Sequence, residues 1–462
     1  MMLLSEVVTV LGAKLIGADV RFESVGSDSR NIGAGQLFVA LKGENFDGNQ
    51  YVADAFAKGA AAVLFADEAQ ISNAHSGLLV KDTRLALGLL ASYWRQKFAI
   101  PLIAITGSNG KTTVKEMISS ILSTVVSGGF ESKSENILAT IGNLNNDIGM
   151  PLTLLRLREN HQYAVIEMGM NHTGEIDYLT ELAKPTVALV NNAGTAHIGE
   201  LGSQQAIAEA KGEIFTGLNM QGVAIINADD TYANYWKTLN SNHKVITFGL
   251  NADAVVTATT TEHGGQSQVS LKTPSGNISF YLNLLGMHNI QNALAASATA
   301  FALDVSLDDI AQGLKRFGGV AGRLTRLQGI NEALVIDDTY NANPDSMRAA
   351  IDVLVQQPGD KVMVMGDMGE LGVDAPRLHA EIGTYAKKSG VDTLLVLGNI
   401  SLEAANSFGE KAHHFVTIEA LVDSLKKRMK KNTTILVKGS RFMKMERVVN
   451  AIVEQSVVWE MH

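Results

Sequence analysis

The stretch TGSNGKTT, residues 106–113, places a lysine and a pair of threonines directly after a turn with two glycines. The preceding LIAIT is typical of a buried strand, and the following KTTVKEMISSILSTV carries apolar residues at helical spacing. Such a strand-turn-helix points backbone N–H groups and the positive end of the helix at the turn, which suits a phosphate group. Lys111 adds a positive charge for the β- and γ-phosphates, and Thr112 adds a hydroxyl ligand for magnesium.

The turn departs from the full phosphate-loop pattern, which has a glycine five residues before Gly110, where this chain has Ile105. We therefore predict a shortened phosphate loop. The residues expected to bind the nucleotide here are Gly107, Ser108, Asn109, Gly110, Lys111, Thr112 and Thr113. The alternative is a glycine-rich connection without a ligand.

Three further residues carry side chains suited to phosphate chemistry. Glu167 ends the apolar run YAVIE, and a carboxylate at the carboxyl end of a strand can hold magnesium directly or through water. The next apolar run, VALVNN, leads to His197 at the same expected edge of the sheet. Lys211 lies in a helical stretch, where a solvated lysine is the ordinary interpretation. From the pattern alone, a solvent-facing Glu167 and a structural His197 stay open as alternatives.

Composition excludes several classes of protein. The chain has 462 residues, a formal net charge of −9 and no cysteine. This length favours about three domains, and the negative charge argues against nucleic acid or a membrane surface as a partner. The absence of cysteine excludes disulfides and thiolate chemistry. The N-terminal MMLLSEVVTVLGAKLIG lacks a basic leader and is interrupted by Glu6, and no run reaches ~18 apolar residues, so we expect a cytoplasmic protein.

The order of apolar runs predicts an α/β fold with three domains. We expect a small N-terminal α/β domain over residues 1–98, a central phosphate-loop domain with a mostly parallel, helix-covered sheet over 99–317, and a C-terminal Rossmann-like domain over 318–462. The glycines between residues 318 and 322 predict a hinge at the second boundary. In the last block, helices are expected near Asp345, Ala375, Ile418 and Arg441.

Six stretches follow one another along the chain: GSNGKTT, EMGMNHTGEI, NNAGTAHIGELGS, AKGEIF, HNIQNALAA and DDTYNANPDSM. Together they resemble the ATP-dependent Mur ligases of peptidoglycan synthesis, and the resemblance spans nearly the whole chain. It implies ATP and two magnesium ions as cofactors, and a carbamylated Lys211, whose charge changes from positive to negative. The catalytic residues that it implies are Lys111, Glu167, His197, Lys211 and Arg323. The metal-holding residues that it implies are Thr112, Glu167, His197 and Lys211.

The resemblance also implies that two domains share the nucleotide. Asn289 and Asn292 match residues on the base side of the nucleotide, although an asparagine on a helix can also pair locally. Arg323, just after the glycine-rich joint, resembles the arginine that reaches the γ-phosphate and the developing acyl phosphate. Asp338 and Tyr340 resemble third-domain residues that meet the ribose and base when the domains close.

Substrate contacts follow from the same resemblance. The stretches NILATIGNLNNDIGMPLTLL, GDMGELG and LVKGSRFMKMERVV are most similar to those of family members that join D-alanyl-D-alanine to UDP-N-acetylmuramoyl-tripeptide. SDSR and the turn ENFDGNQY resemble the uridine-nucleotide site, although Asn49 stands where family members commonly have histidine. VKGSR resembles a segment near the incoming amine or the substrate carboxylate. The expected substrate-binding residues are Ser27, Asp28, Ser29, Arg30, Asp47, Gly48, Asn143, Asn145, Asn146, Lys438 and Ser440.

Other interpretations stay open at this point. Another amino-acid-adding Mur ligase is the nearest alternative. An accessory ATPase that drives a partner would use the same phosphate loop, but it would release phosphate without a dipeptide. A dinucleotide-binding oxidoreductase would need a G-x-G-x-x-G turn with a following acidic residue, and the chain lacks one. We expect a monomer, and the sequence leaves open whether the third residue of the acceptor peptide is diaminopimelate or lysine.

Overall fold

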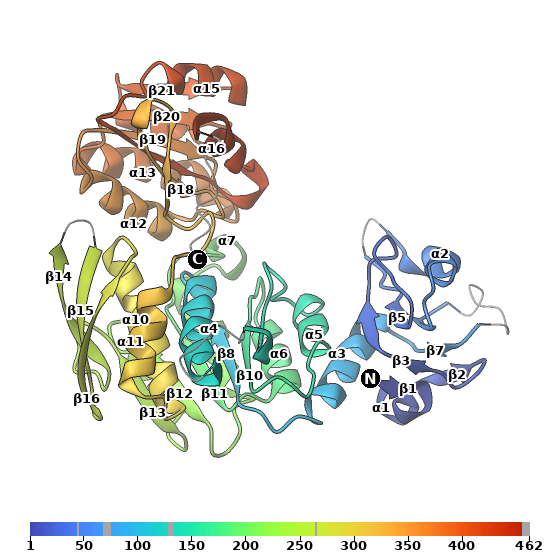
Figure 1. The fold of residues 1–462 in the computed structure, drawn as a ribbon. Helices are drawn as coiled ribbons and strands as arrows, with labels where there is room; N and C mark the ends of the chain where they lie inside the picture. The colour runs from blue at the N-terminus through green and yellow to red at the C-terminus, as the bar shows by residue number, and fades with distance from the viewer. Residues whose placement is uncertain (44–45, 68–74, 128–133, 264–265, 455–462) are drawn as a thin grey trace.

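The computed structural model describes residues 1–43, 46–67, 75–127, 134–263 and 266–454. It has three α/β domains in chain order, with the first at one side of the central domain and the third above it (Figure 1). The fold class predicted from the sequence is therefore confirmed. The predicted limits, 1–98, 99–317 and 318–462, stay predictions.

The first domain is built on a five-stranded sheet with the order β2-β7-β6-β5-β4. Neighbouring strands are parallel except for β2 and β7, and β1 and β3 form a separate antiparallel pair. The strands are β1 (Met2–Leu3), β2 (Lys14–Ile16), β3 (Arg21–Phe22), β4 (Ser24–Gly26), β5 (Gln36–Val39), β6 (Ala62–Phe65) and β7 (Gly77–Leu79). The helices are α1 (Val8–Leu11), α2 (Val52–Ala57) and α3 (Thr83–Arg95).

The central domain has a six-stranded sheet in which every neighbouring pair is parallel. Its order is β13-β12-β11-β8-β10-β9, so the strand before the phosphate loop, β8, lies between β11 and β10. The strands are β8 (Leu102–Thr106), β9 (Ile137–Ala139), β10 (Tyr163–Glu167), β11 (Val187–Val190), β12 (Val223–Asn227) and β13 (Lys244–Phe248). Because all of them run in one direction, the segments that follow β8, β10 and β11 meet at one edge.

Alternate residues of the central strands face opposite helix layers. In β8, Leu102 and Ala104 belong to one core, whereas Ile103 and Ile105 belong to the other. The first layer contains α5 (Gly149–Leu154), α6 (Glu175–Ala183), α8 (Gln204–Gly212) and α9 (Ala233–Leu239). The second layer contains α4 (Lys111–Ser127), α10 (Met287–Ala302) and α11 (Leu307–Arg316). Within the described ranges, no helix is both long and apolar enough to cross a membrane.

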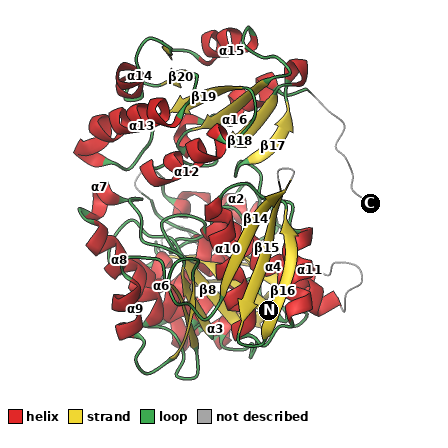
Figure 2. Cartoon of the chain, turned by 90° about the vertical axis from the view of Figure 1, so that its left-hand side faces the viewer, coloured by secondary structure: helices red, strands yellow, loops and turns green. Residues whose placement is uncertain are grey.

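A three-stranded antiparallel sheet lies beside α10 and α11 in the central domain (Figure 2). Its strands are β14 (Thr257–His263), β15 (Gln266–Thr273) and β16 (Gly276–Leu282). Val269, Leu271, Phe280 and Leu282 turn inward and join the second core. This sheet is absent from the sequence prediction, because its strands are rich in threonine, serine and glutamine and contain no long apolar run.

The third domain is an open α/β sheet with the order β17-β18-β22-β19-β20-β21, in which only β17 is antiparallel. Its strands are β17 (Thr325–Gln328), β18 (Leu334–Asp338), β19 (Asp360–Gly366), β20 (Thr393–Leu397), β21 (Ala412–Phe415) and β22 (Thr433–Lys438). Its helices are α12 (Pro344–Val355), α13 (Ala375–Ser389), α14 (Leu402–Phe408), α15 (Ile418–Lys426) and α16 (Glu446–Ile452). The helix expected near Arg441 begins as a 3-10 turn and becomes α-helical only at Glu446, because Lys444 has a φ of +50°.

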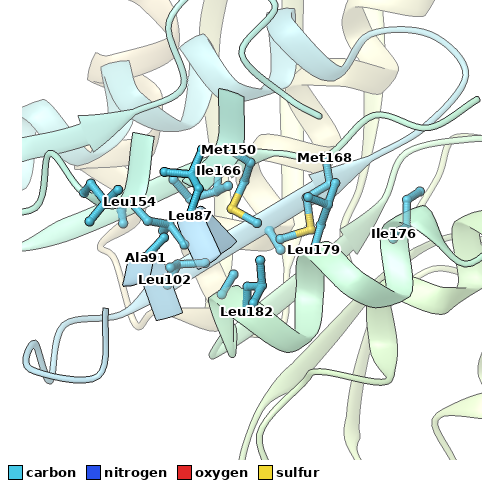
Figure 3. Close-up of a cluster of buried hydrophobic side chains, with 14 of the residues drawn as sticks. Leu87, Ala91, Leu102, Met150, Leu154, Ile166, Met168, Ile176, Leu179 and Leu182 are labelled. Atoms are coloured by element: carbon cyan, nitrogen blue, oxygen red, sulfur yellow. The ribbon is translucent and has the colours of Figure 1, made fainter. Parts of the chain in front are cut away.

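Helix α3 attaches the first domain to the central one. Its Leu87 and Ala91 pack among Met150 and Leu154 of α5 and other apolar side chains from β8, β10 and α6 (Figure 3). Trp94 Nε1 donates a hydrogen bond to a central-domain carbonyl at 3.1 Å. The helix counted with the first domain in the sequence prediction therefore also builds the core of the second.

Candidate active site

The phosphate loop joins the carboxyl end of β8 to the amino end of α4. Asn192, which follows β11, holds it in place: its carbonyl oxygen accepts the Ser108 N–H at 3.0 Å, and its Oδ1 accepts the Asn109 N–H at 2.9 Å. Gly110 has a φ of +81°, and a Cβ atom there would lie 2.3 Å from Asn292 Oδ1. Only glycine fits at this position.

Lys111 is the first residue of α4, and its side chain folds back over the loop. Its Nζ donates a hydrogen bond to Gly107 O at 2.7 Å. Burial lowers the pKa of Lys111, and the Arg323 guanidinium lowers it further, whereas the Glu167 carboxylate raises it. Burying the Lys111 ammonium near the Arg323 guanidinium is unfavourable, and an anion bound in the loop would offset this cost.

Glu167 is the last residue of β10, as the sequence predicted, and its side chain is buried. Oε2 accepts a hydrogen bond from Thr112 Oγ1 at 3.0 Å, and Oε1 accepts one from Asn145 Nδ2 at 2.8 Å. The Glu167 N–H donates to Thr140 Oγ1 at 2.9 Å. Two of the residues predicted to hold magnesium, a hydroxyl and a carboxylate, are therefore in direct contact, and the solvent-facing alternative for Glu167 is excluded.

His197 lies at the same edge of the sheet, directly before the short helix α7 (Ile198–Leu201). Its Nδ1 lies 2.9 Å from Oε2 of Glu370, a residue of the third domain, which is the distance of an ion pair, although the angle falls outside hydrogen-bond geometry. The imidazole lowers the pKa of the Glu370 carboxyl group, which therefore stays ionised. Sequence reasoning missed Glu370, although its stretch GDMGELG had been singled out as distinctive.

Lys211 lies in α8 with only 2% of its surface exposed, which excludes the interpretation of a solvated lysine. Burial lowers its pKa well below the ordinary value, and the charge of Lys111 adds to the effect. Within the part of the chain that the structure describes, its Nζ has no hydrogen-bond or ion-pair partner. Lys211 is thus a buried amine whose charged form is disfavoured relative to that of a solvated lysine.

Two cavities lie between the central and third domains, and the first has a volume of about 370 Å³. Its lining includes Asn289, Asn292 and Asp338, three of the residues predicted to meet the nucleoside. Asn292 Nδ2 donates to Asn289 Oδ1 at 3.2 Å, and Asn191 Nδ2 donates to Asn292 Oδ1 at 3.0 Å. The two helix asparagines therefore pair locally and also line the cavity.

Asp338 and Lys438, one hundred residues apart, form a buried ion pair on this cavity. Lys438 Nζ donates to Asp338 Oδ2 at 2.6 Å and to Asn341 O at 2.9 Å. Burial lowers the pKa of Lys438, and the Asp338 carboxylate opposes this. Ser440 points elsewhere, because its Oγ accepts the Gly369 N–H at 2.7 Å. Lys438 thus lies beside a predicted nucleoside residue, and its role toward the amine substrate stays a prediction.

The second cavity has a volume of about 580 Å³ and brings together most of the predicted catalytic residues. Lys211 lines neither cavity. The residues predicted from the sequence that line the second cavity are Ser108, Asn109, Gly110, Lys111, Thr112, Asn143, Asn145, Asn146, Glu167, His197, Arg323 and Tyr340.

Arg323 lines both cavities. Its guanidinium carbon lies 4.1 Å from the centre of the Tyr340 ring, so the two side chains stack. Its Nε is buried and has no hydrogen-bond partner among the described residues. A buried donor without a partner is costly, and an anionic ligand in either cavity would satisfy it.

Magnesium held together with a nucleotide fits these residues. Across the described ranges, no three histidine, aspartate or glutamate side chains are grouped closely enough to hold a metal ion on their own. Thr112 and Glu167 nevertheless offer adjacent oxygen donors. Magnesium is commonly bound by one or two carboxylates and substrate phosphates rather than by a complete protein cage. The donor set therefore suits a magnesium ion that arrives with ATP.

The first-domain candidates line neither cavity. Arg30 Nε and Nη2 donate to the Asp28 carboxylate at 2.9 and 2.8 Å, which lowers the pKa of Asp28 to about 2. Asn49 is buried, and its Nδ2 donates to Asp47 Oδ1 at 2.7 Å. Asn49 therefore fixes the turn in which it stands. Residues 44–45 of the predicted uridine-nucleotide turn lie outside the described residues.

Direct hydrogen bonds connect the third domain to the phosphate-loop edge. Asn343 Nδ2 donates to Asn109 Oδ1 at 2.8 Å. Thr195 donates to Asp345 Oδ2 twice, through its N–H at 2.7 Å and through its Oγ1 at 2.8 Å. Sequence reasoning assigned no role to Asn343 or Asp345. Both stand in the quoted stretch DDTYNANPDSM, and its polar side chains after a strand were the available signal.

Models of one protein family match most of the chain. The Mur ligase family catalytic domain matches residues 21–95, the Mur ligase middle domain matches 105–300, and the Mur ligase glutamate ligase domain matches 322–441. The chain is also 44% identical over 459 residues to the UDP-N-acetylmuramoyl-tripeptide–D-alanyl-D-alanine ligase of Escherichia coli K12, with 98% of each chain covered. The chain belongs to the Mur ligase family. This Mur ligase is 36% identical to the Bacillus subtilis 168 enzyme of the same name, with 93% of each chain covered.

Solved Mur ligase structures share the whole arrangement. A crystal structure of MurF from Acinetobacter baumannii is 39% identical with a TM-score of 0.89, and the match covers 96% of this Mur ligase and 97% of that chain. MurF from Thermotoga maritima in complex with ADP is 25% identical with a TM-score of 0.82, covering 93% and 96%. The resemblance read from the sequence motifs is therefore confirmed.

Proposed function

We infer that this Mur ligase joins D-alanyl-D-alanine to UDP-N-acetylmuramoyl-tripeptide while ATP is converted to ADP and phosphate, a step in peptidoglycan synthesis. Relatives that match nearly the whole chain are named UDP-N-acetylmuramoyl-tripeptide–D-alanyl-D-alanine ligases. The observation that carries the chemistry is the second cavity, where the phosphate loop of one domain faces Arg323 of the next. A nucleotide tail and an anionic peptide have to meet in such a place.

The reaction needs an activated acid, because a free carboxylate is a poor electrophile. A terminal carboxylate oxygen of the tripeptide attacks the γ-phosphorus of ATP, and the bond between that phosphorus and the bridging oxygen of ADP breaks. The amine of D-alanyl-D-alanine then attacks the carbonyl carbon of the acyl phosphate and loses a proton. Inorganic phosphate leaves with its electron pair, and a peptide bond remains.

Neutralising charge is the main task of the protein in the first step, because two anions approach each other. Lys111 and the N–H groups at the amino end of α4 bind the triphosphate of ATP. Arg323 serves the transferred phosphoryl group from the opposite side, and its unpartnered Nε supports this assignment. The residues of the loop, 107–113, bind the nucleotide, with Asn289, Asn292, Asp338 and Tyr340 on the nucleoside side.

Two magnesium ions complete the proposed site. Thr112 and Glu167 would hold one of them, which their mutual contact of 3.0 Å supports, and His197 would hold the other. Bound magnesium would withdraw charge from the phosphate oxygens and so ease the attack of the carboxylate on the γ-phosphorus. Asn145 keeps Glu167 oriented through its hydrogen bond of 2.8 Å.

We propose that the Lys211 side chain is carbamylated. Only a neutral amine captures carbon dioxide, and burial lowers the pKa of Lys211, which favours the neutral amine relative to a solvated lysine. The product is an anion, which would pair with the Lys111 charge that now lowers the Lys211 pKa. Electron density for a carboxyl group beyond Lys211 Nζ would support this modification, and a bare amine at full occupancy in bicarbonate would contradict it.

The remaining assignments concern the substrates and the domains. We propose that the first domain, residues 1–98, binds the uridine nucleotide through Ser27, Asp28, Ser29, Arg30, Asp47 and Gly48. Asn143, Asn145 and Asn146 face the tripeptide, and Lys438 and Ser440 serve the amine substrate. The chain works as a monomer in the cytoplasm. The joint at residues 318–322 acts as a hinge, supported by the positive φ of Gly319 and Gly322.

ADP release with each substrate omitted in turn tests the proposed function. We expect ADP to form at a sustained rate only when UDP-N-acetylmuramoyl-tripeptide and D-alanyl-D-alanine are both present. Sustained phosphate release without the dipeptide would contradict the proposal and favour an accessory ATPase. Preference for a single amino acid, with a shorter UDP-muramoyl peptide as acceptor, would identify a different amino-acid-adding Mur ligase.

A further inference from the structure

A loop of the third domain reaches across to His197. The loop follows β19 and contains Glu370, whose Oε2 lies 2.9 Å from His197 Nδ1. The backbone of Glu370 touches the same segment, because its carbonyl oxygen accepts the Gly199 N–H at 3.2 Å. A side-chain contact and a backbone hydrogen bond thus bind one residue of the third domain to the start of α7.

Both partners have an unusual backbone. Glu370 has a φ of +63° and His197 a φ of +64°, a region that side chains other than glycine adopt rarely. Such conformations persist when the surrounding structure over-determines them, and they cluster at functional sites. Here the two left-handed residues contact each other across the boundary between the central and third domains.

Hydrogen bonds within the third domain hold the loop that carries Glu370. The Met368 N–H donates to His379 Nε2 at 2.9 Å, and the Gly369 N–H donates to Ser440 Oγ at 2.7 Å. His379 is fully buried, and burial lowers its pKa. Its Nε2 accepts the Met368 N–H and its Nδ1 lies 2.7 Å from Ala375 O, which assigns the proton to Nδ1. Two consecutive N–H groups are thus held, and Glu370 is presented to the central domain from a rigid support.

The approach of the two segments is also very close. A Cβ atom on Gly199 would lie 2.6 Å from the backbone nitrogen of Gly372 and 2.9 Å from Glu370 O. Backbone therefore packs directly on backbone beside the His197–Glu370 contact. This fit exists only while the third domain rests on the central domain.

We propose that Glu370 is an interdomain positioning residue: when the third domain docks, its carboxylate holds Nδ1 of His197 and leaves Nε2 as the ring nitrogen that serves the second cavity. This inference rests on the proposed function, in which His197 is a metal ligand. Histidine ligands are commonly oriented through their second ring nitrogen by a carboxylate. In this Mur ligase the carboxylate comes from another domain, so docking of the third domain completes the site.

Removing the charge of Glu370 without changing its size tests the proposal. Glu370→Gln keeps the size of the side chain, and Glu403→Gln, a half-buried glutamate of the same domain that lines neither cavity, is the matched control. We expect Glu370→Gln to lower kcat ~10-fold, because the carboxylate that orients His197 is lost, while the KM for UDP-N-acetylmuramoyl-tripeptide stays within about twofold. Mn²⁺ binding in the presence of a non-hydrolysable ATP analogue, measured by electron paramagnetic resonance, should weaken ~10-fold. Neither value should change in Glu403→Gln.

A double-mutant cycle distinguishes positioning from a general effect on folding. With His197→Asn as the second change, Glu370→Gln should add little further loss of kcat or Mn²⁺ affinity, because it acts through the ring that has been removed. Fully additive losses would overturn the inference, and so would a Glu370→Gln variant that matches wild type in both measurements. If wild-type ADP release does not require both substrates, the proposed function itself fails, and that result is distinct from either outcome.

Discussion

The two domain interfaces of this Mur ligase differ in kind. The first domain meets the central domain through apolar side chains of α3, such as Leu87 and Ala91, which are buried in one continuous core with residues of α5 and α6 (Figure 3). The third domain meets the central domain mainly through polar pairs, with Ile198 and Leu285 as partly buried apolar contacts. The polar pairs are Asn343 with Asn109, Asp345 with Thr195, and Glu370 with His197. Cavities of about 370 and 580 Å³ lie at the second interface.

We infer from this difference that the first interface is fixed, whereas the second opens and closes. Opening the apolar interface would expose a hydrophobic core to water, which is costly. Opening the polar interface exchanges hydrogen bonds for contacts with water at a small net cost. Interfaces of the second kind permit relative domain motion. We therefore expect the third domain to move as substrates enter and leave, and the first domain to stay attached through α3.

The largest expected effect comes from removing a cation at the polar interface. Arg323→Ala should lower kcat by ~10³-fold, because arginine stabilises transferred phosphoryl charge, and it should change the affinity for an ATP analogue much less. ADP-release kinetics and titration calorimetry measure the two quantities. Arg326→Ala, three residues along and outside both cavities, is the control. Equal losses of affinity and kcat would contradict a role in the transition state.

A change at the apolar interface should act on stability instead. Leu87→Ala should lower the free energy of unfolding by about 2–5 kcal/mol, because it leaves a cavity in a packed core. The folded fraction should keep its kcat. Urea unfolding followed by circular dichroism measures the loss. Leu85→Ala, on the same helix but 56% exposed, should have little effect, and an equal loss in both variants would refute the packing argument.

A smaller effect is expected from one polar pair of the moving interface. Asn343→Ser keeps a side-chain oxygen to cap α12, where Asn343 Oδ1 now accepts the Ser346 N–H at 2.9 Å, but it loses the hydrogen bond to Asn109. One such bond contributes about 0.5–1.5 kcal/mol, so the KM for ATP should rise by up to about tenfold. Steady-state kinetics measure it. A KM equal to that of wild type would show that this pair does not support the docked domain.

The smallest effect is expected at the rim of the apolar interface. Arg84 on α3 pairs with Asp147, and its Nη2 donates at 2.7 Å, but the arginine side chain is 55% exposed. Exposed ion pairs contribute less than about 1 kcal/mol, so Arg84→Ala should shift the unfolding midpoint only slightly. A loss as large as that of Leu87→Ala would show that charge, and not packing, holds the first domain.

The sequence predicted the fold where strands are fully buried and failed where they are polar. Runs such as LIAIT and VALVNN become parallel strands, since both faces of the sheet are covered by helices. The antiparallel sheet β14–β16 escaped prediction because polar residues such as Thr259, Ser270 and Ser279 occupy its exposed face and interrupt the apolar pattern. The helix expected near Arg441 begins later because a left-handed residue, Lys444, interrupts it.

The site was predictable where chemistry is local. The phosphate loop and the strand-end Glu167 carry their signal in adjacent residues and in the rule that parallel strands end at one edge. The pairing of Asp338 with Lys438 and the contact of Glu370 with His197 join segments that are far apart in the chain. Residue spacing in a sequence does not predict such long-range contacts, so only the folded structure reveals them.

Crystals of the protein soaked with a non-hydrolysable ATP analogue and magnesium provide the most direct measurement. We expect the triphosphate to lie on the N–H groups of residues 107–113, with the γ-phosphate between Lys111 and Arg323. A triphosphate bound outside the interface of the central and third domains, with residues 107–113 empty, would contradict it.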